Sequence, residues 1–394
     1  GRHGRRRGEG VTAMANDRTR DRAEKIETAR ARSLAWLAAM QAEGLPRGVT
    51  RISAAHDPAR WPGVLLPGTY NAVMCLDLLG GLDDWSADER GALVEWLESH
   101  RAADGVFRLP GMAAADTFKK PDADETRRYI DWHLTNYGLG AVDALAPGRP
   151  ALLAFAEPFL DITTLKAWLC DRDLRDPWQE GNNIVNLASF FLMMRRDGDA
   201  ATAARVASAL DVLFAWHDRL REPTTGFWGV GQLSDPHRLL HAFAGSMHDF
   251  HLWYHEGRPL EGQDRAVDYC LTLPPVIDSA CIDVDAVDVL IHGHALLDHR
   301  RAEIEAWLAT LLDALLAFQN PDGGFCDVCD GIRRQDGWVR GYEEPQGLSN
   351  TFATWFRWVA IAMIAEVLIP GFRSWRFRRT IGIGYRRDPG APTP

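Results

Sequence analysis

The sequence predicts an all-α protein, most simply an (α/α)6-type barrel of about twelve helices in inner and outer rings. Apolar residues recur with helical spacing along most of the chain, and no segment keeps the alternation of a strand. Short turns rich in glycine, proline and aspartate separate the helical segments. Several segments are apolar nearly all round, as expected of inner helices beneath an outer layer. An α-solenoid or two packed bundles are the alternatives.

The helices are predicted in order from these patterns. The first covers residues 17–43, and the second, 68–82, ends at paired glycines. Ser86 is a good N-cap for the third, with acids in its first turn. Further helical segments follow at 126–145, 162–170, 182–194, 201–216 and 237–254. The last core helix, capped by Ser349 or Asn350, stops before Pro370.

A glycine turn that precedes an aromatic residue occurs three times after an apolar helix. Its glycines are Gly105, Gly226 and Gly323. The intervals between them fit two helical hairpins each, which is what a closed barrel of paired helices predicts.

One domain is predicted over residues 17–370, because no polar linker divides the chain. Residues 1–16 are basic and rich in glycine, and we expect a disordered tail upstream of the true start. Residues 371–394 are basic and end in proline, and we expect a surface strap and tail.

Composition limits the partners. A net charge of −10 argues against nucleic acid, which needs clustered lysine and arginine. The six cysteines lack a disulfide-framework spacing, which favours reduced thiols in the cytoplasm. The longest apolar run, residues 358–370, is too short to span a bilayer, although peripheral membrane contact stays open. Fifteen tryptophans fit a helical core or a pocket for sugars or hydrocarbons. No oligomeric state is indicated.

Three acids open an otherwise apolar helix: Asp283, Asp285 and Asp288. Burying unpaired carboxylates costs several kcal/mol, so such a cluster needs a reason. Asp285 and Asp288 share a helical face with His292 one turn further, which predicts an acid–base cluster at the barrel mouth. The alternative is that Asp283 caps the helix and Asp285 interacts only with its dipole.

This region resembles the class II terpene cyclases of the squalene–hopene cyclase type. Asp283 and Asp285 match the first two acids of their Asp-x-Asp-Asp motif, and residues 319–325 match their Gln-x-x-x-Gly-x-aromatic turn. Ala286 stands where that family has its last acid. The helical-hairpin repeat is also similar to that of protein prenyltransferase β subunits, but their Asp-x-Cys zinc pattern is not matched.

The resemblance implies that Asp285 and Asp283 are catalytic residues, and the shared helical face adds Asp288 as a third catalytic candidate. Asp285 would protonate an alkene or an epoxide, and Asp283 would support its acidity. The pocket would then hold the cation against aromatic faces, each worth about 2 kcal/mol or more when water is excluded. Burial would keep Asp285 protonated. No cofactor is implied.

A carbohydrate-active enzyme on the same barrel is the main alternative, as a glycosidase, polysaccharide lyase or sugar epimerase. A glycosidase needs two opposed carboxyls, for which the candidates are Asp285, Asp288, Glu180, Glu343 and Glu344. An epimerase or lyase needs a base, such as His248 or His133, near Arg357. A barrel without catalytic activity is the third hypothesis.

Polar and aromatic residues on apolar helices are candidates for binding the small-molecule or oligosaccharide substrate. Arg357 lies among aromatic residues and needs a carboxylate partner or an anionic ligand, because arginine is rarely buried unpaired. The substrate-binding candidates are His248, Trp253, Tyr254, Asn182, Asn183, Trp355 and Arg357.

No metal site is predicted. His292 and His299 share a helical face, but His294 does not, and no second ligand set follows at a suitable spacing. Cys326-x-x-Cys329 resembles half a zinc site or a redox pair, but no second such motif exists. We therefore interpret these thiols as structural.

Overall fold

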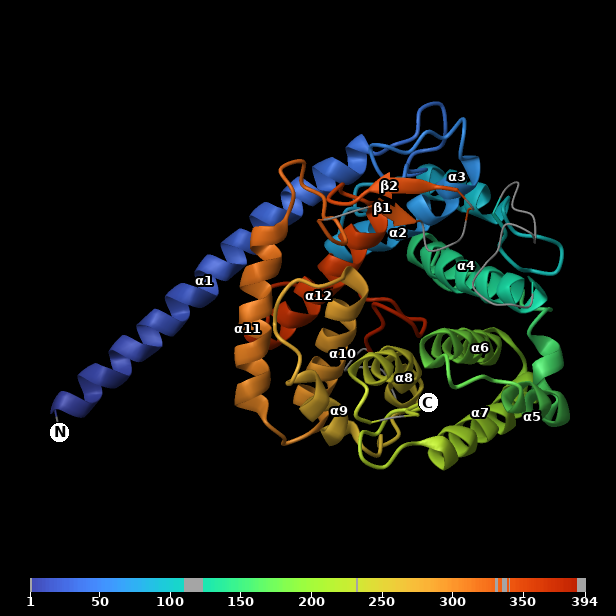
Figure 1. Ribbon diagram of the computed structural model, residues 1–394. Coiled ribbons are helices and arrows are strands. Elements are labelled where there is room, and N and C mark those ends of the chain that lie inside the picture. The colour runs from blue at the N-terminus through green and yellow to red at the C-terminus, as the bar shows by residue number, and fades with distance from the viewer. Residues whose placement is uncertain are drawn as a thin grey trace.

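A computed structural model describes residues 2–109, 123–231, 233–329, 332–334, 339 and 341–387. This part of the chain is mostly helical, as predicted, with twelve α-helices (Figure 1). They are α1 (Arg2–Ala39), α2 (Leu65–Leu79), α3 (Ala87–Glu98), α4 (Ala123–Leu145), α5 (Ile162–Cys170), α6 (Pro177–Asp197), α7 (Ala200–Leu220), α8 (Pro236–Glu256), α9 (Gln263–Cys270), α10 (Ala280–Leu296), α11 (Arg301–Phe318) and α12 (Thr351–Leu368).

The even-numbered helices pack against one another in chain order. Helix α2 contacts α4, α4 contacts α6, and the same holds for α6 with α8, α8 with α10, and α10 with α12. Helix α12 in turn contacts α2. Helices α6, α10 and α12 bury residues on every side, whereas α3, α7 and α11 bury one face. The latter group lies towards the outside of the molecule (Figure 1).

Local sequence signals set the ends of the helices. Ser86 accepts a hydrogen bond from the Glu89 N–H and forms a full capping box, which confirms the predicted start of α3. Helix α2 ends at Gly80, whose positive φ of 73° suits glycine. Asn350, one of the two predicted caps, accepts from the Ala353 N–H at the start of α12. Helix α1 begins at Arg2 and so takes in most of the predicted tail.

The recurrent glycine turn has the same structure each time. Its glycine has a positive φ, which a residue with a Cβ rarely adopts. Two residues later, the backbone N–H donates to a hydroxyl group on α4, α8 or α12. The three turns pair Gly105 (94°) with Thr135, Gly226 (78°) with Ser246, and Gly323 (99°) with Thr354. Four helices separate successive turns, which confirms the two predicted hairpins per interval.

Two short strands were not predicted. β1 (Ile332–Arg334) pairs antiparallel with β2 (Glu343–Pro345) in the loop before α12. Each has three residues, so neither could show the alternation by which strands are recognised.

Helix α12 is the one helix in the described residues that is long and apolar enough to cross a membrane. Other parts of the protein bury 78% of it. It contacts α2, α10 and α11, so its apolar surface is covered by protein.

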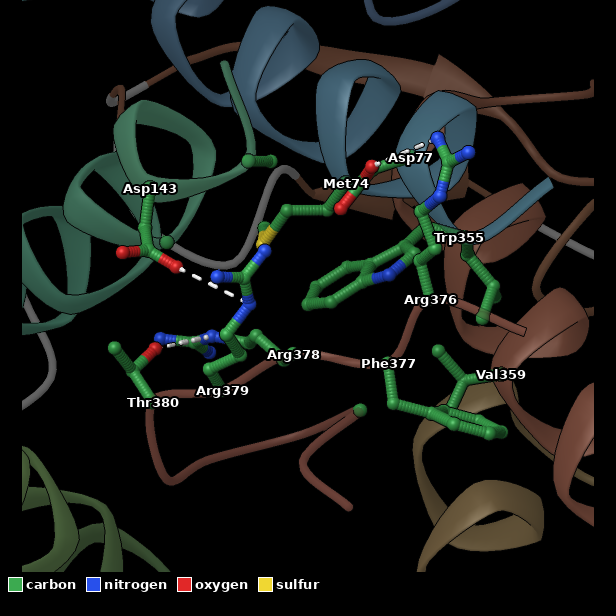
Figure 2. A pocket seen from close by; sticks show the side chains of 14 residues that line it. Met74, Asp77, Asp143, Trp355, Val359, Arg376, Phe377, Arg378, Arg379 and Thr380 are labelled. Atoms are coloured by element: carbon green, nitrogen blue, oxygen red, sulfur yellow. Dashed lines mark hydrogen bonds and ion pairs between the residues drawn. The ribbon is translucent and has the colours of Figure 1, made fainter. Parts of the chain in front are cut away.

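The predicted surface position of the segment after α12 is wrong for Ile381, Ile383 and Tyr385, which are buried. Their alternation with glycine allows an extended chain to place large side chains in the core. Ionic contacts fix the segment beside a small cavity of about 20 Å³ (Figure 2). There Arg376 lies 3.7 Å from Asp77 of α2, and Arg379 lies 4.0 Å from Asp143 of α4.

Candidate functional site

A cavity of about 340 Å³ lies among the even-numbered helices. Its walls come from α4, α6, α8, α10 and α12, from the residues just before α6 and α10, and from the loops on either side of α12. Aromatic rings and histidines make up much of the lining, which consists of Tyr129, His133, Tyr137, Asp176, Trp178, Gln179, Asn182, His241, His248, Ser279, Cys281, Asp327, Phe352, Phe356 and Ile383.

One face of α4 contributes a column of three rings. Tyr129, His133 and Tyr137 recur every four residues, which places them above one another on a helix. The His133 ring centroid lies 5.8 Å from that of Tyr129 and 4.5 Å from that of Tyr137. Only His133 was a candidate from the sequence, although the spacing of the three residues is a signal that could have found the others.

Helix α10 carries the acid cluster, but none of the three carboxyls is among the described residues that line this cavity. Its N-cap is Ser279, so the alternative that Asp283 caps the helix is wrong. Cys281 lines the cavity, and the helical repeat places Asp285, Asp288 and His292 on the same side of α10 as Cys281, where all three are buried.

Asp285 is fully buried, and neither of its carboxylate oxygens has a hydrogen-bond partner among the described residues. Burial raises the pKa of this carboxyl well above its usual value, and the nearby charges of Asp288 and Asp283 raise it further. Burial therefore favours the neutral, protonated form of the Asp285 carboxyl.

The pKa of Asp288 shifts in the opposite direction to that of Asp285, although the two residues lie one helical turn apart. Its Oδ1 is 3.1 Å from both His251 Nε2 and His292 Nδ1. Burial alone would raise the pKa of Asp288, but the two imidazoles outweigh that effect and hold its pKa below the usual value. Tyr254 stacks on the His292 ring at a centroid distance of 3.9 Å. The direction of this pKa shift favours the ionised form of Asp288, while Oδ1 accepts no hydrogen bond among the described residues and His292 Nδ1 lies 2.9 Å from the Asp288 backbone carbonyl.

Asp283 and Arg357 form a buried ion pair on the other side of α10. Burial raises the pKa of Asp283 to about 6, and Arg357 partly opposes that rise. Arg357 also donates to the Asp327 carbonyl at 2.7 Å, and Asp327 Oδ1 accepts from the Ala280 N–H at 2.7 Å. The carboxylate partner predicted for Arg357 is therefore present, and neither member of the pair lines the cavity.

His248 faces the cavity as a neutral imidazole. Its Nδ1 lies 2.6 Å from the Ala244 carbonyl, which can only accept, so Nδ1 carries the proton. Burial lowers the pKa of His248 to about 4, despite that hydrogen bond. Nε2 consequently holds a free lone pair beside the cavity.

The asparagine candidates lie at the start of α6. Asn182 lines the cavity and donates to the Trp178 carbonyl, whereas Asn183 donates to Glu180 at 3.1 Å. Glu180 is buried and paired with Arg172 at 3.1 Å. Its charge is therefore already neutralised, which disfavours Glu180 as a glycosidase carboxyl.

The remaining candidates lie around the cavity but not in its lining. Trp253 packs edge-on against Phe214 of α7 at 4.8 Å. Trp355 packs edge-on against Tyr137 at 5.5 Å and borders the small cavity near the C-terminal segment (Figure 2). Glu344 is buried and accepts from the Tyr342 hydroxyl at 3.0 Å, whereas Glu343 is exposed.

Among the residues that the structure describes, no three histidine, cysteine or carboxylate side chains are placed to hold a metal ion. No protein-family model matches the chain, and no curated protein matches it either. Its chemistry must therefore be argued from the geometry of the site.

Proposed function

We propose that the twelve helices form an (α/α)6 barrel with the six even-numbered helices inside. The order of their contacts supports this arrangement, since each inner helix touches the next and α12 touches α2. The cavity then occupies the mouth of the barrel, and the segment with Ile383 closes its floor.

We infer that the protein is an enzyme similar to class II terpene cyclases, which protonates an alkene or epoxide in a prenyl chain. One observation carries the proposal: Asp285 is a fully buried carboxyl with a raised pKa and no hydrogen-bond partner within the described part of the chain. A carbon–carbon double bond is weakly basic, so protonating it requires a carboxylic acid that water and cations do not stabilise as an anion.

The neighbours of Asp285 suit the cation that such a step creates. When the Asp285 proton bonds to one alkene carbon, the other carbon becomes positive. Asp288 holds a negative charge on the same side of α10, and aromatic rings line the cavity above it. Both attract a cation in a site without water. Nε2 of His248 is a base that can accept the final proton.

Protonation fits the cavity better than loss of a diphosphate group. No lysine or arginine is found among the described residues that line it, whereas Asp176 and Asp327 are. A diphosphate needs several cationic groups or metal ions for binding and departure. The proposed substrate is therefore a prenyl chain whose reacting end is uncharged.

The carbohydrate-active alternative is tested in the same experiment. Purified protein is incubated in D2O with squalene, squalene epoxide, a C20 polyprenol, polyprenyl diphosphates and acidic oligosaccharides, and the products are analysed by mass spectrometry. A cyclic product with one carbon-bound deuterium is expected from a substrate protonated at an alkene, because the Asp285 proton exchanges with solvent. From squalene epoxide, where the proton is transferred to oxygen, a cyclic alcohol without carbon-bound deuterium is expected. Cleavage or epimerisation of a sugar, with every prenyl substrate unchanged, would reject the cyclase.

A further inference from the structure

The Cys326-x-x-Cys329 motif lies in the loop between α11 and α12, close to the cavity but outside its lining. Cys326 is buried and Cys329 is exposed, and neither forms a disulfide here. Only two residues separate the two cysteines, and the neighbouring Cys329 contributes to the raised pKa of Cys326. One sulfur is thus open to a solution reagent, while the second lies beside it and is shielded.

The backbone holds the two cysteines in this relation. The carbonyl of Phe325, just before the motif, accepts from the Asn350 N–H at 3.0 Å. The carbonyl of Val328, inside the motif, accepts from the Gly347 N–H at 2.8 Å. These bonds fix the loop against the segment that leads into α12, so the cysteines approach each other in a loop already ordered.

We propose that Cys326 and Cys329 are a thiol–disulfide exchange site that reacts with low-molecular-weight disulfides of the glutathione type. The thiolate of Cys329 attacks one sulfur of the reagent, forms a mixed disulfide and releases one thiolate. The sulfur of Cys326 then attacks Cys329, and its proton leaves with the second thiolate. In sum, two protein thiols and one disulfide give one protein disulfide and two small thiols.

The exposure of the two cysteines sets the order of these steps. Only Cys329 can meet a bulky reagent in solution. Burial, together with the neighbouring Cys329, raises the pKa of Cys326 to about 11, so Cys326 is a poor first nucleophile. Once Cys329 carries the leaving group, Cys326 is held next to it, and proximity favours the second step.

The site is linked to the cavity through Asp327, which lies between the two cysteines. Asp327 accepts from the Ala280 N–H at the start of α10, and its carbonyl accepts from Arg357. Closing the disulfide constrains the backbone on both sides of Asp327. We therefore expect oxidation to alter the anchoring of the first turn of α10.

The first experiment treats the reduced full-length protein with glutathione disulfide, blocks free thiols with iodoacetamide and maps the peptides by mass spectrometry. The expected product lacks two hydrogens and has Cys326 and Cys329 joined, and dithiothreitol reverses it. In Cys326→Ser, Cys329 should retain one glutathionyl group, because the resolving thiol is missing. Cys170→Ser, which removes the exposed thiol on α5, should react as the wild type does.

Three results would overturn the proposal. Both cysteines could remain open to iodoacetamide, wild-type Cys329 could retain glutathione without resolving, or Cys329 could join Cys281 instead. None of these results depends on turnover, so the exchange site and the proposed cyclase can fail separately.

Hydrogen exchange tests the link to α10. The peptide that contains Ala280 should exchange at a different rate in oxidised and reduced protein, while peptides from α7 should not change. Equal hydrogen-exchange rates at Ala280 in the oxidised and reduced protein would show that the disulfide does not affect the start of α10.

Discussion

Helix α10 carries two acids, Asp283 and Asp285, whose surroundings differ sharply. Asp283 faces Arg357 and the loop before α12, where a guanidinium balances its charge. Asp285 lies on the side of α10 that carries Cys281, and neither of its oxygens has a hydrogen-bond partner among the described residues. Both carboxyls are buried, and burial raises the pKa of both.

The difference separates a structural acid from a reactive one. Pairing Asp283 with Arg357 ties α10 to α12 and leaves no proton to transfer. An unpaired buried carboxyl contributes nothing comparable to stability, and its isolation is costly unless the proton stays on. The side of α10 with the unsatisfied acid is therefore where chemistry is expected.

The largest expected effect is a loss of turnover when Asp285 is replaced. Asp285→Asn should reduce cyclisation of any prenyl substrate about 10²- to 10⁴-fold, the range that a general acid contributes. Asn has nearly the same shape and no acidic proton. The rate of product formation is measured by mass spectrometry. His294→Ala serves as the control, because it removes only the pair that His294 forms with Glu305 near the surface. Full turnover by Asp285→Asn would show that Asp285 is not the proton donor.

The next largest effect is a loss of stability when the ion pair between Asp283 and Arg357 is broken. Arg357→Met should lower the free energy of unfolding by about 3–5 kcal/mol, because it leaves Asp283 buried without its partner. Urea denaturation measures the loss, and the double variant Asp283→Asn, Arg357→Met should recover most of it. If the double variant is as unstable as the single one, the guanidinium acts by packing and not by charge.

This loss should also depend on pH. The folded-state pKa of Asp283 is raised to about 6, so its ionised form is the unfavourable one in the fold. A group with a raised folded pKa contributes stability below its unfolded pKa, and that contribution disappears as the pH rises through the folded pKa. Arg357→Met should therefore be less destabilised near pH 4 than near pH 8.

A smaller effect is expected on the pH dependence of turnover, through the influence of Asp288 on Asp285. Turnover should fall as the pH rises, because Asp285 loses its proton. The negative charge of Asp288 contributes to the raised pKa of Asp285, so Asp288→Asn should move this alkaline limb to lower pH. The pH profile of the rate constant measures the shift. An unmoved limb in a folded, active variant would mean that Asp288 does not influence the proton donor.

The smallest effect concerns stability on the cavity side. Asp285→Asn should change the free energy of unfolding by about 1 kcal/mol or less, since one neutral, unpaired polar group replaces another. The same urea measurement applies. A loss as large as that of Arg357→Met would show that Asp285 has a structural partner, and the contrast between the two acids would disappear.

Much of the fold follows from local signals in the sequence. Helical periodicity, the Ser86 cap and the three glycine turns each depend on neighbours within a few residues. A carboxylate or an anionic ligand was predicted as the partner of Arg357. The sequence could not decide between them or identify Asp283, because Asp283 lies far away in the chain and meets Arg357 only through packing. The buried position of Ile381 and Ile383 likewise depends on the space between helices.

The site was predictable in part. Helical spacing alone grouped Asp285, Asp288 and His292. It could not tell that His251 of α8 would lie 3.1 Å from Asp288, or that Asp285 would lack any partner. Those facts depend on the packing of α8 against α10, and they decide which acid keeps its proton.

The buried C-terminal segment has a consequence for how the protein is made. Ile381, Ile383 and Tyr385 follow α12, so a ribosome releases all twelve helices before it releases these residues. Until then, the interior between α2, α4 and α12 lacks the side chains that fill it. Assembly of this part of the core therefore waits until the segment after α12 has been made, and truncation after α12 should leave a chain that chaperones retain.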